Sequence, residues 1–235
     1  MIKFKTPLIS GTLIKRYKRF LAQILLDSGD IVTAHCPNPG SMKGLAIEGE
    51  KVWLEKSFNP KAKLPFGWRL SQLENNSFVV VDTTLANKVI FNALIKGEIR
   101  YLNSYEKIKP EIKYGLNSRL DFLLESNSSP PCYLEVKSVS LAEGSTALFP
   151  DSITKRGAKH LHELSDIASQ GGRAIILYLI QRTDVSQWDL ACDIDQAYCK
   201  AFNEATLKGV EVMAFRSNIS TEGIQVGEEL FRRCT

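Results

Sequence analysis

The sequence has few of the residues and motifs from which common catalytic sites are built. It contains only three histidines, and two of them, His160 and His162, would lie on different faces of a helix. This excludes a zinc site made of clustered imidazoles. The patterns G-x-x-x-x-G-K-[ST], G-x-G-x-x-G and G-x-S-x-G are all absent. The sequence therefore does not predict a P-loop nucleotide hydrolase, a dinucleotide-dependent enzyme or a serine hydrolase.

Long hydrophobic runs and paired cysteines are also lacking. No apolar segment approaches the roughly 20 residues that span a bilayer, and the N-terminus lacks the apolar core of a signal peptide. We therefore expect a cytoplasmic protein with no membrane segment. The cysteines are odd in number and form no C-x-x-C pair, at positions 36, 132, 192, 199 and 234. Their spacing predicts reduced thiols rather than disulfides or a zinc site.

The first third of the chain is basic and β-rich. Residues 1–82 contain 12 Lys and Arg against 7 Asp and Glu, whereas residues 83–235 contain 18 against 19. Short β-like runs are separated by Gly, Pro and Asn clusters, with a hairpin turn predicted at residues 27–30. About five strands without a helix predict a small barrel in residues 1–82, for which the OB-fold is the natural candidate.

The pattern changes near residue 83. Helical apolar spacing over residues 83–99 predicts a helix with a threonine at its N-cap. The elements expected after it are strands at 111–116, 119–125 and 132–139, a helix at 152–169, a strand at 173–180, a helix at 193–209 and a strand at 210–215. This order predicts a mixed α/β domain in residues 83–235.

Two acids and a lysine interrupt the apolar strands of this domain. Glu135 and Lys137, in the run YLEVKSVSL, are two positions apart and share one face of a strand. Asp121 interrupts the preceding strand, so a hairpin would bring it close to them. Oxygen atoms are the ligands that Mg²⁺ prefers. We predict a Mg²⁺ or Mn²⁺ site formed by Asp121, Glu135 and the Val136 carbonyl, in which Lys137 activates or stabilises the attacking water.

The Glu-x-Lys spacing alone is not specific, because about one copy is expected by chance in a chain of this composition. A second copy occurs at residues 111–113. The alternative interpretation is a salt bridge at a strand end, with Asp121 on a solvent-facing edge. Register separates the two interpretations, because pairing of Asp121 with Val136 would turn its side chain away from the other two.

Two further segments are candidates for contact with nucleic acid. In the segment KRYKRF, residues 15–20, Lys15, Tyr17 and Arg19 would share one face of a strand and form a basic ridge with an aromatic platform. A solvated edge strand is the alternative. The predicted helix after Glu135 carries a polar stripe that could hold a phosphate or simply face solvent. The nucleic-acid-binding candidates are Lys15, Arg16, Tyr17, Lys18, Arg19, Arg156 and His160.

The order of Asp121, Glu135 and Lys137 resembles the PD-(D/E)xK nuclease superfamily, with Leu120 in place of the usual proline. Four longer segments resemble the sugar fermentation stimulation protein A family: HCPNPGSMKGL (35–45), SRLDF (118–122), CYLEVKSVSLAEG (132–144) and FPDSITKRGAKHLHEL (149–164). The resemblance implies an OB-like barrel followed by a PD-(D/E)xK-type domain. It also implies a DNA-binding protein linked to maltose metabolism, with nuclease activity suspected from the fold.

The same resemblance suggests accessory residues. Superfamily relatives often carry an acidic ligand on the helix before the three strands, which makes Glu98 a candidate. The resemblance is strong in the loop NPGSM, residues 38–42, so we expect Asn38 and Ser41 to face the cleft between the two domains.

We therefore predict a cytoplasmic two-domain DNA-binding protein whose C-terminal domain is a Mg²⁺-dependent nuclease. The alternative is a non-catalytic DNA-binding transcriptional regulator that keeps the fold. A third interpretation places RNA or another phosphodiester in the same cleft. The DNA could be single- or double-stranded, and the sequence leaves a homodimer open.

Overall fold

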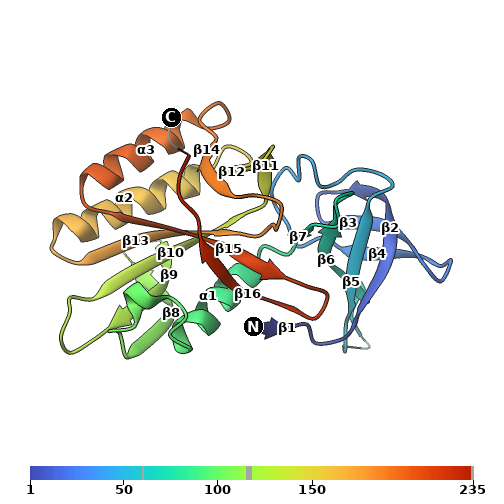
Figure 1. Ribbon diagram of the computed structural model, residues 1–235, viewed down its shortest axis with the longest axis horizontal. Coiled ribbons are helices and arrows are strands. Elements are labelled where there is room, and N and C mark those ends of the chain that lie inside the picture. Colours follow the sequence, from blue (N-terminus) through green and yellow to red (C-terminus); the bar gives the residue numbers. More distant parts are fainter. Residues whose placement is uncertain (60, 115–117, 234–235) are drawn as a thin grey trace.

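The computed structural model describes residues 1–59, 61–114 and 118–233 and shows two parts side by side (Figure 1). The N-terminal part is a small β-barrel, and the C-terminal part is a mixed sheet covered by helices. No helix among the described residues is long and apolar enough to cross a membrane.

The N-terminal part is the predicted five-stranded OB-like barrel, with one additional short strand. The strands pair in the order β4-β3-β2-β5-β6-β7, and a parallel pairing of β4 with β6 closes the barrel. Their bounds are β2 Leu8–Tyr17, β3 Leu21–Leu26, β4 Ile31–His35, β5 Lys51–Lys56, β6 Phe66–Gln72 and β7 Phe78–Val80. Alternate apolar residues of these strands fill the barrel, with Trp68 and Leu54 fully buried.

A tight turn divides the basic segment that was predicted as one strand. β2 ends at Tyr17 and β3 begins at Leu21. Lys18 and Arg19 both have positive φ, 46° and 62°. The prediction that Lys15, Tyr17 and Arg19 share one strand face is therefore wrong, because Arg19 lies in the turn. Positive φ is uncommon for non-glycine residues, so the sequence pattern did not predict this turn.

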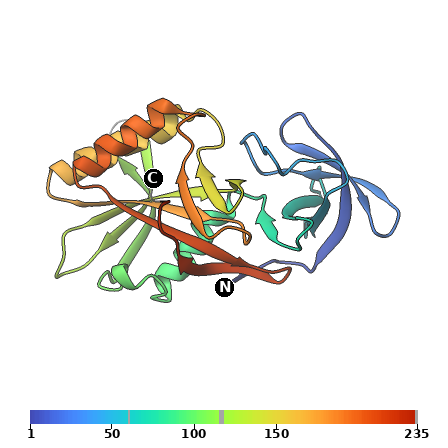
Figure 2. The same cartoon turned by 45° about the horizontal axis from the view of Figure 1, so that its top comes forward.

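The C-terminal part is built on a seven-stranded sheet in the order β1-β16-β15-β13-β10-β9-β8. Its strands are β1 Ile2–Lys3, β8 Lys107–Tyr114, β9 Ser118–Glu125, β10 Cys132–Val139, β13 Arg173–Ile180, β15 Glu211–Ile219 and β16 Gly223–Glu229. β10, β13 and β15 are parallel and central. β13 is an almost uninterrupted apolar run because it is buried on both faces of the sheet. The first and last strands of the chain are neighbours in this sheet, since β1 pairs with β16, and the N-terminus lies beside the red hairpin (Figure 2).

Helices cover the two faces of this sheet. α1 Leu85–Ile95 packs on one face, and α2 Lys155–Ser169 and α3 Gln196–Leu207 lie side by side on the other (Figure 1). Each helix buries the apolar side that its periodicity predicts, so each face of the sheet has its own core.

Short elements complete the domain and were not predicted. A three-stranded sheet is formed by β11 Leu141–Glu143, β12 Thr146–Phe149 and β14 Gln187–Leu190, and a 3₁₀ turn, η1, spans Arg100–Leu102. β11 follows β10 after a single residue, so the chain that carries Glu135 continues directly into this small sheet.

Backbone hydrogen bonds connect the barrel to the C-terminal domain. The Val80 amide donates to the Gln181 carbonyl (2.9 Å), and the Thr183 amide donates to the Phe78 carbonyl (3.1 Å). The last barrel strand is thereby attached to the segment that follows β13. These bonds fix one edge of the interface between the two parts.

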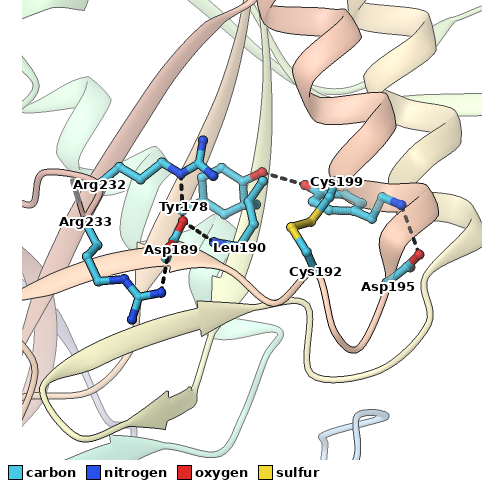
Figure 3. The surroundings of a disulfide bond; sticks show 9 residues. Tyr178, Asp189, Leu190, Cys192, Asp195, Cys199, Arg232 and Arg233 are labelled. Atoms are coloured by element: carbon cyan, nitrogen blue, oxygen red, sulfur yellow. Dashed lines mark hydrogen bonds and ion pairs between the residues drawn. A yellow bond between two sulfur atoms is a disulfide. The ribbon is translucent and has the colours of Figure 1, made fainter. Parts of the chain in front are cut away.

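The prediction that the cysteines are reduced thiols is wrong for one pair. Cys192 and Cys199 form a disulfide, with Cα atoms 5.6 Å apart (Figure 3). Asp195, between them, starts α3 by accepting a hydrogen bond from the Tyr198 amide (2.9 Å). The chain turns into the helix at this point, which brings the two sulfur atoms together. A search for the C-x-x-C pattern does not detect this pair of cysteines.

The remaining cysteines are placed differently. Cys36 and Cys132 are free and buried, and burial raises the pKa of the Cys132 thiol to about 12. Such thiols are inert, which agrees with their predicted reduced state. Cys234 lies outside the described residues.

Candidate active site

Strand β9 changes the direction of its side chains at Asp121. Leu120 packs in the core under α2 and α3, whereas Phe122 packs in the core under α1. Residues two apart share one face of a regular strand, so β9 is twisted at the residue between them. On β8, Glu111 lies opposite Asp121 and has a φ of +53°. Both strands therefore depart from regular geometry at the level of Asp121.

The Asp121 carboxylate is held by β10 and α1. Oδ2 accepts a hydrogen bond from the Val136 amide (2.8 Å), and Oδ1 accepts one from Asn87 Nδ2 (2.7 Å). The paired residues of β9 and β10 end at Phe122 and Leu134, which puts Asp121 level with Glu135. The carboxylate thus approaches β10 along the sheet and contacts the backbone between Glu135 and Lys137.

Glu135 is the centre of a buried polar cluster. Its residue is only 3% exposed. Oε1 accepts a hydrogen bond from Lys137 Nζ (2.7 Å) and contacts His160 Nδ1, on α2. Oε2 is also buried and has no partner among the described residues. A buried carboxylate oxygen without a donor is unfavourable unless a cation binds it.

The two carboxylates influence each other. Burial and the nearby Glu135 charge raise the pKa of Asp121 to about 6, despite its hydrogen bonds from Val136 and Asn87. Burial alone would also raise the pKa of Glu135, but Lys137 and His160 outweigh it and hold this pKa below its usual value. Glu135 therefore ionises at lower pH than Asp121, and Asp121 carries the unfavourable energy of two neighbouring acids.

The donor set fits a hard divalent cation. Such ions take oxygen ligands from carboxylates, carbonyls and water, and here the unpaired Glu135 Oε2 and the Asp121 carboxylate lie at the same level of the sheet. No cluster of three or more His, Cys, Asp or Glu that could hold a metal occurs within residues 1–59, 61–114 and 118–233. A cation here would therefore need further ligands from a backbone carbonyl, such as that of Val136, or from water.

The basic segment holds a loop of the barrel. Arg16 donates to the carbonyl oxygens of Asn38, Gly40 and Ser41. Arg19 donates to the Pro39 carbonyl. These two guanidinium groups are thus engaged within the protein, in contrast to the predicted free ridge.

The other cations of this segment face solvent. Lys15 and Lys18 are exposed, and Lys15 Nζ lies 6.0 Å from the centre of the Tyr17 ring. They remain available as phosphate contacts, with Tyr17 as an adjacent aromatic surface.

The two candidates on α2 are placed differently from each other. His160 is buried, contacts Glu135 and accepts a hydrogen bond from Arg156 Nε on Nε2 (3.3 Å). Both ring nitrogens of His160 are therefore engaged within the protein. Arg156 is exposed.

The accessory candidates are separated by the structure. Asn38 is buried and lines the cleft between the two parts, and the Ser41 amide donates to Asp151 Oδ2 across it (2.9 Å). Glu98 is exposed beyond the C-terminal end of α1. Asn87, in the first turn, is the α1 residue that contacts Asp121. At 1.5 Å per residue, the helix from Asn87 to Ile95 spans on the order of 12 Å, so Glu98 lies beyond the opposite end of α1 from Asn87.

Two residues of the site were missed or misassigned. No local pattern distinguishes Asn87 from other polar residues in the first turn of a helix. The contact of His160 with Glu135 joins residues 25 positions apart, so it depends on how α2 packs against β10. The available signal was the polar stripe predicted on the helix. It placed His160 on α2 but did not predict the direction of the His160 side chain.

The fold and site define a two-domain protein, an OB-like barrel joined to a mixed α/β domain. Residues 14–81 match the family model for the "SfsA N-terminal OB domain", and residues 84–223 match that for the "Sugar fermentation stimulation protein RE domain". The chain belongs to the sugar fermentation stimulation protein family.

Relatives and a solved structure cover the whole chain. Proteins named "Sugar fermentation stimulation protein homolog" from Roseobacter denitrificans and Ruegeria pomeroyi are each 51% identical, over 96% and 97% of this chain and 97% and 100% of their own lengths. The solved structure of Pyrococcus furiosus SfsA in complex with Ca²⁺ is 26% identical, covers 100% of both chains and superposes with a TM-score of 0.88.

Proposed function

We propose that this protein binds nucleic acid and hydrolyses phosphodiester bonds with a divalent cation, Mg²⁺ or Mn²⁺. The observation that carries the proposal is the buried Glu135 carboxylate, whose Oε2 has no partner among the described residues and whose charge acts on a second acid, Asp121. A divalent cation would give Glu135 Oε2 a partner and would relieve the repulsion between the Glu135 and Asp121 carboxylates. The Ca²⁺ complex of the Pyrococcus furiosus relative supports a divalent cation in this family.

Each residue of the site has a role in this proposal. Asp121, Glu135 and the Val136 carbonyl hold the cation, which when bound neutralises charge on the phosphate. Lys137, with Nζ 2.7 Å from Glu135 Oε1, holds the attacking water and stabilises the negative charge that develops. His160 fixes the Glu135 side chain from the buried side. On the barrel, Lys15 and Lys18 contact the phosphates of the strand.

One observation favours a second function. Lys137, Glu135 and His160 already satisfy one another, as in a structural ion-pair network. This arrangement fits a DNA-binding regulator that keeps the fold without cleavage. The two functions differ in whether the site needs a bound cation. A regulator has no need of an unpaired carboxylate oxygen close to polyanionic DNA.

Asp121→Asn, compared with wild type, tests the proposal. Purified proteins are incubated with Mg²⁺ or Mn²⁺ and single-stranded, duplex or branched DNA, or RNA. We expect Asp121→Asn to lose cleavage by about 100-fold or more, because it removes a cation ligand. The matched control is Asp193→Asn at an exposed position outside the site, which should cleave like wild type.

A second readout is independent of cleavage. Ca²⁺ should raise the Tm of wild type and of Asp193→Asn but not that of Asp121→Asn. Equal cleavage by all three proteins would reveal a contaminating nuclease. Nucleic-acid binding without cleavage of any substrate, and without a Ca²⁺ effect on Tm, would establish the regulator instead.

A further inference from the structure

A cleft of about 450 Å³ lies between the barrel and the C-terminal domain. On one side it is lined by Arg19 and the barrel loop at residues 38–40. On the other side it is lined by residues 138–141, which follow Lys137 directly, and by residues 148–154 with Arg156. Its volume falls in the range of about 300–1,000 Å³ that is typical of small-ligand sites. The cleft therefore begins next to the proposed catalytic lysine.

One part of the cleft is suited to an anion. Arg19, whose Nε and Nη2 donate to the Pro39 carbonyl, lines it from the barrel, and Arg156 lines it from the C-terminal domain. The N-terminus of the 15-residue helix α2, capped by Thr154, also faces it and adds the positive end of its dipole. In the barrel wall, the Asn38 residue is 2% exposed, and its Nδ2 has no acceptor among the described residues. An unpaired buried donor is unfavourable, and a phosphate oxygen placed against it would relieve this cost.

One carboxylate lines the cleft among the described residues, that of Asp151. Its Oδ2 accepts hydrogen bonds from the Ser41 amide (2.9 Å) and from Ser41 Oγ (3.4 Å). The Asp151 charge is therefore directed at the barrel loop. The two arginines leave the cleft lining with a net positive charge.

Part of the remaining wall is apolar, and the hydroxyl residues Thr83, Ser138, Ser140, Ser152 and Thr154 also line the cleft. The apolar part is formed by Leu141, Phe149, Pro150 and Ile153, of which Ile153 is 73% exposed. An exposed apolar side chain beside two cations favours a ligand that has both an anionic group and a flat apolar face. A nucleotide combines these features, with its phosphate and its base.

We propose that this cleft binds one unpaired nucleotide of the strand that is cleaved. Its phosphate lies against Arg156, Arg19 and Asn38, and its base lies against Ile153 and Leu141. A paired base with two backbones does not fit a cleft of this size, so the cleft selects single-stranded or locally unpaired nucleic acid. This inference rests on the proposed function and specifies the form of its substrate.

Binding of labelled oligonucleotides tests the inference. Fluorescence anisotropy is measured with a single-stranded oligonucleotide and with the matching duplex, in EDTA so that no cleavage occurs. We expect wild type to bind the single strand more tightly, and Arg156→Gln to weaken this binding about tenfold. The matched control is Lys155→Gln, which removes the same charge from an exposed neighbour that does not line the cleft, and it should change binding less than twofold.

A second variant guards against misfolding, because Arg156 also contacts His160. Ile153→Glu places a negative charge on the exposed wall and should weaken single-strand binding by a similar factor while leaving Tm unchanged. Equal effects of Arg156→Gln and Lys155→Gln, or equal losses for duplex and single strand, would overturn the inference. So would wild type that binds no single strand.

These outcomes are separable from those of the proposed function. If no substrate is cleaved but the contrast between Arg156→Gln and Lys155→Gln is seen, the cleft binds the nucleotide and the catalytic proposal fails. If wild type cleaves DNA and the two variants bind the single strand equally, the catalytic proposal stands and the cleft inference fails.

Discussion

The Glu-x-Lys pattern occurs twice in the C-terminal domain, on two strands of one sheet. Glu135 and Lys137 lie on β10, between β9 and β13, where Glu135 is buried and contacts His160. Glu111 and Lys113 lie on β8, an edge strand of the sheet, and both are exposed. There Glu111 pairs with Arg119 at 3.4 Å, not with its own lysine.

The difference shows that strand position, not the tripeptide, makes the candidate site. On a central strand both residues are enclosed by neighbouring elements, so their charges interact strongly and need partners. On the edge strand water solvates both, and an exposed ion pair contributes little. The second copy is therefore a natural internal control for the first.

The largest expected contrast is in cleavage. Lys137→Ala should reduce cleavage by about 100-fold or more, because Lys137 holds the attacking water and stabilises negative charge at the phosphate. Lys113→Ala should leave the rate within about twofold, because its ammonium is exposed on β8 and has no part in the proposed chemistry. Initial rates on the best DNA or RNA substrate measure both. Similar losses in the two variants would mean that general positive charge, and not the β10 site, supports the reaction.

The next contrast is in stability. Glu135→Ala leaves Lys137 and His160 without their shared partner in a buried position, so the free energy of unfolding should fall by about 3 kcal/mol. Glu111→Ala removes only an exposed ion pair and should cost less than about 1 kcal/mol. Urea unfolding in EDTA measures both values without a contribution from bound cations. Equal costs would contradict the conclusion that burial distinguishes the two copies.

The sequence predicted the elements of both copies, because local patterns determine them. Periodicity identified β9, β10 and α2 to within a few residues, and the apolar run of β13 indicated a strand covered on both faces. Asp121 and Glu135 were placed on adjacent strands for the same reason. The register of β9 and β10 followed only from the folded hairpin.

Other features depend on contacts that local patterns do not encode. The turn at Lys18 and Arg19 uses positive φ without glycine, so it could not be distinguished from a continuous strand. The disulfide between Cys192 and Cys199 requires the turn that starts α3. The small sheet of β11, β12 and β14 consists of strands of three or four residues, too short for a periodic signal.

The smallest expected contrast concerns Asp121, which lies between the two copies. Burial and the Glu135 charge raise its pKa from 3.8 to about 6, whereas Glu111, although opposite on β8, is exposed and its charge is screened by water. Because the folded state holds this proton more tightly than the unfolded state, the carboxyl group lowers stability progressively as pH rises from about 4 to about 6. Asp121→Asn should therefore match wild type near pH 4 in EDTA and exceed its free energy of unfolding by about 2 kcal/mol at pH 7.

Glu135 is expected to contribute to this penalty in addition to burial. Glu135→Gln should lower the Asp121 pKa toward its ordinary value, and Glu111→Gln should leave it unchanged; NMR titration of the Asp121 carboxyl group measures each shift. If Glu111→Gln produced the larger shift, the β8 copy would be electrostatically coupled to the site and could not serve as its control. If neither variant shifted the pKa, burial alone would set it, and the two carboxylates would lie too far apart to share a cation.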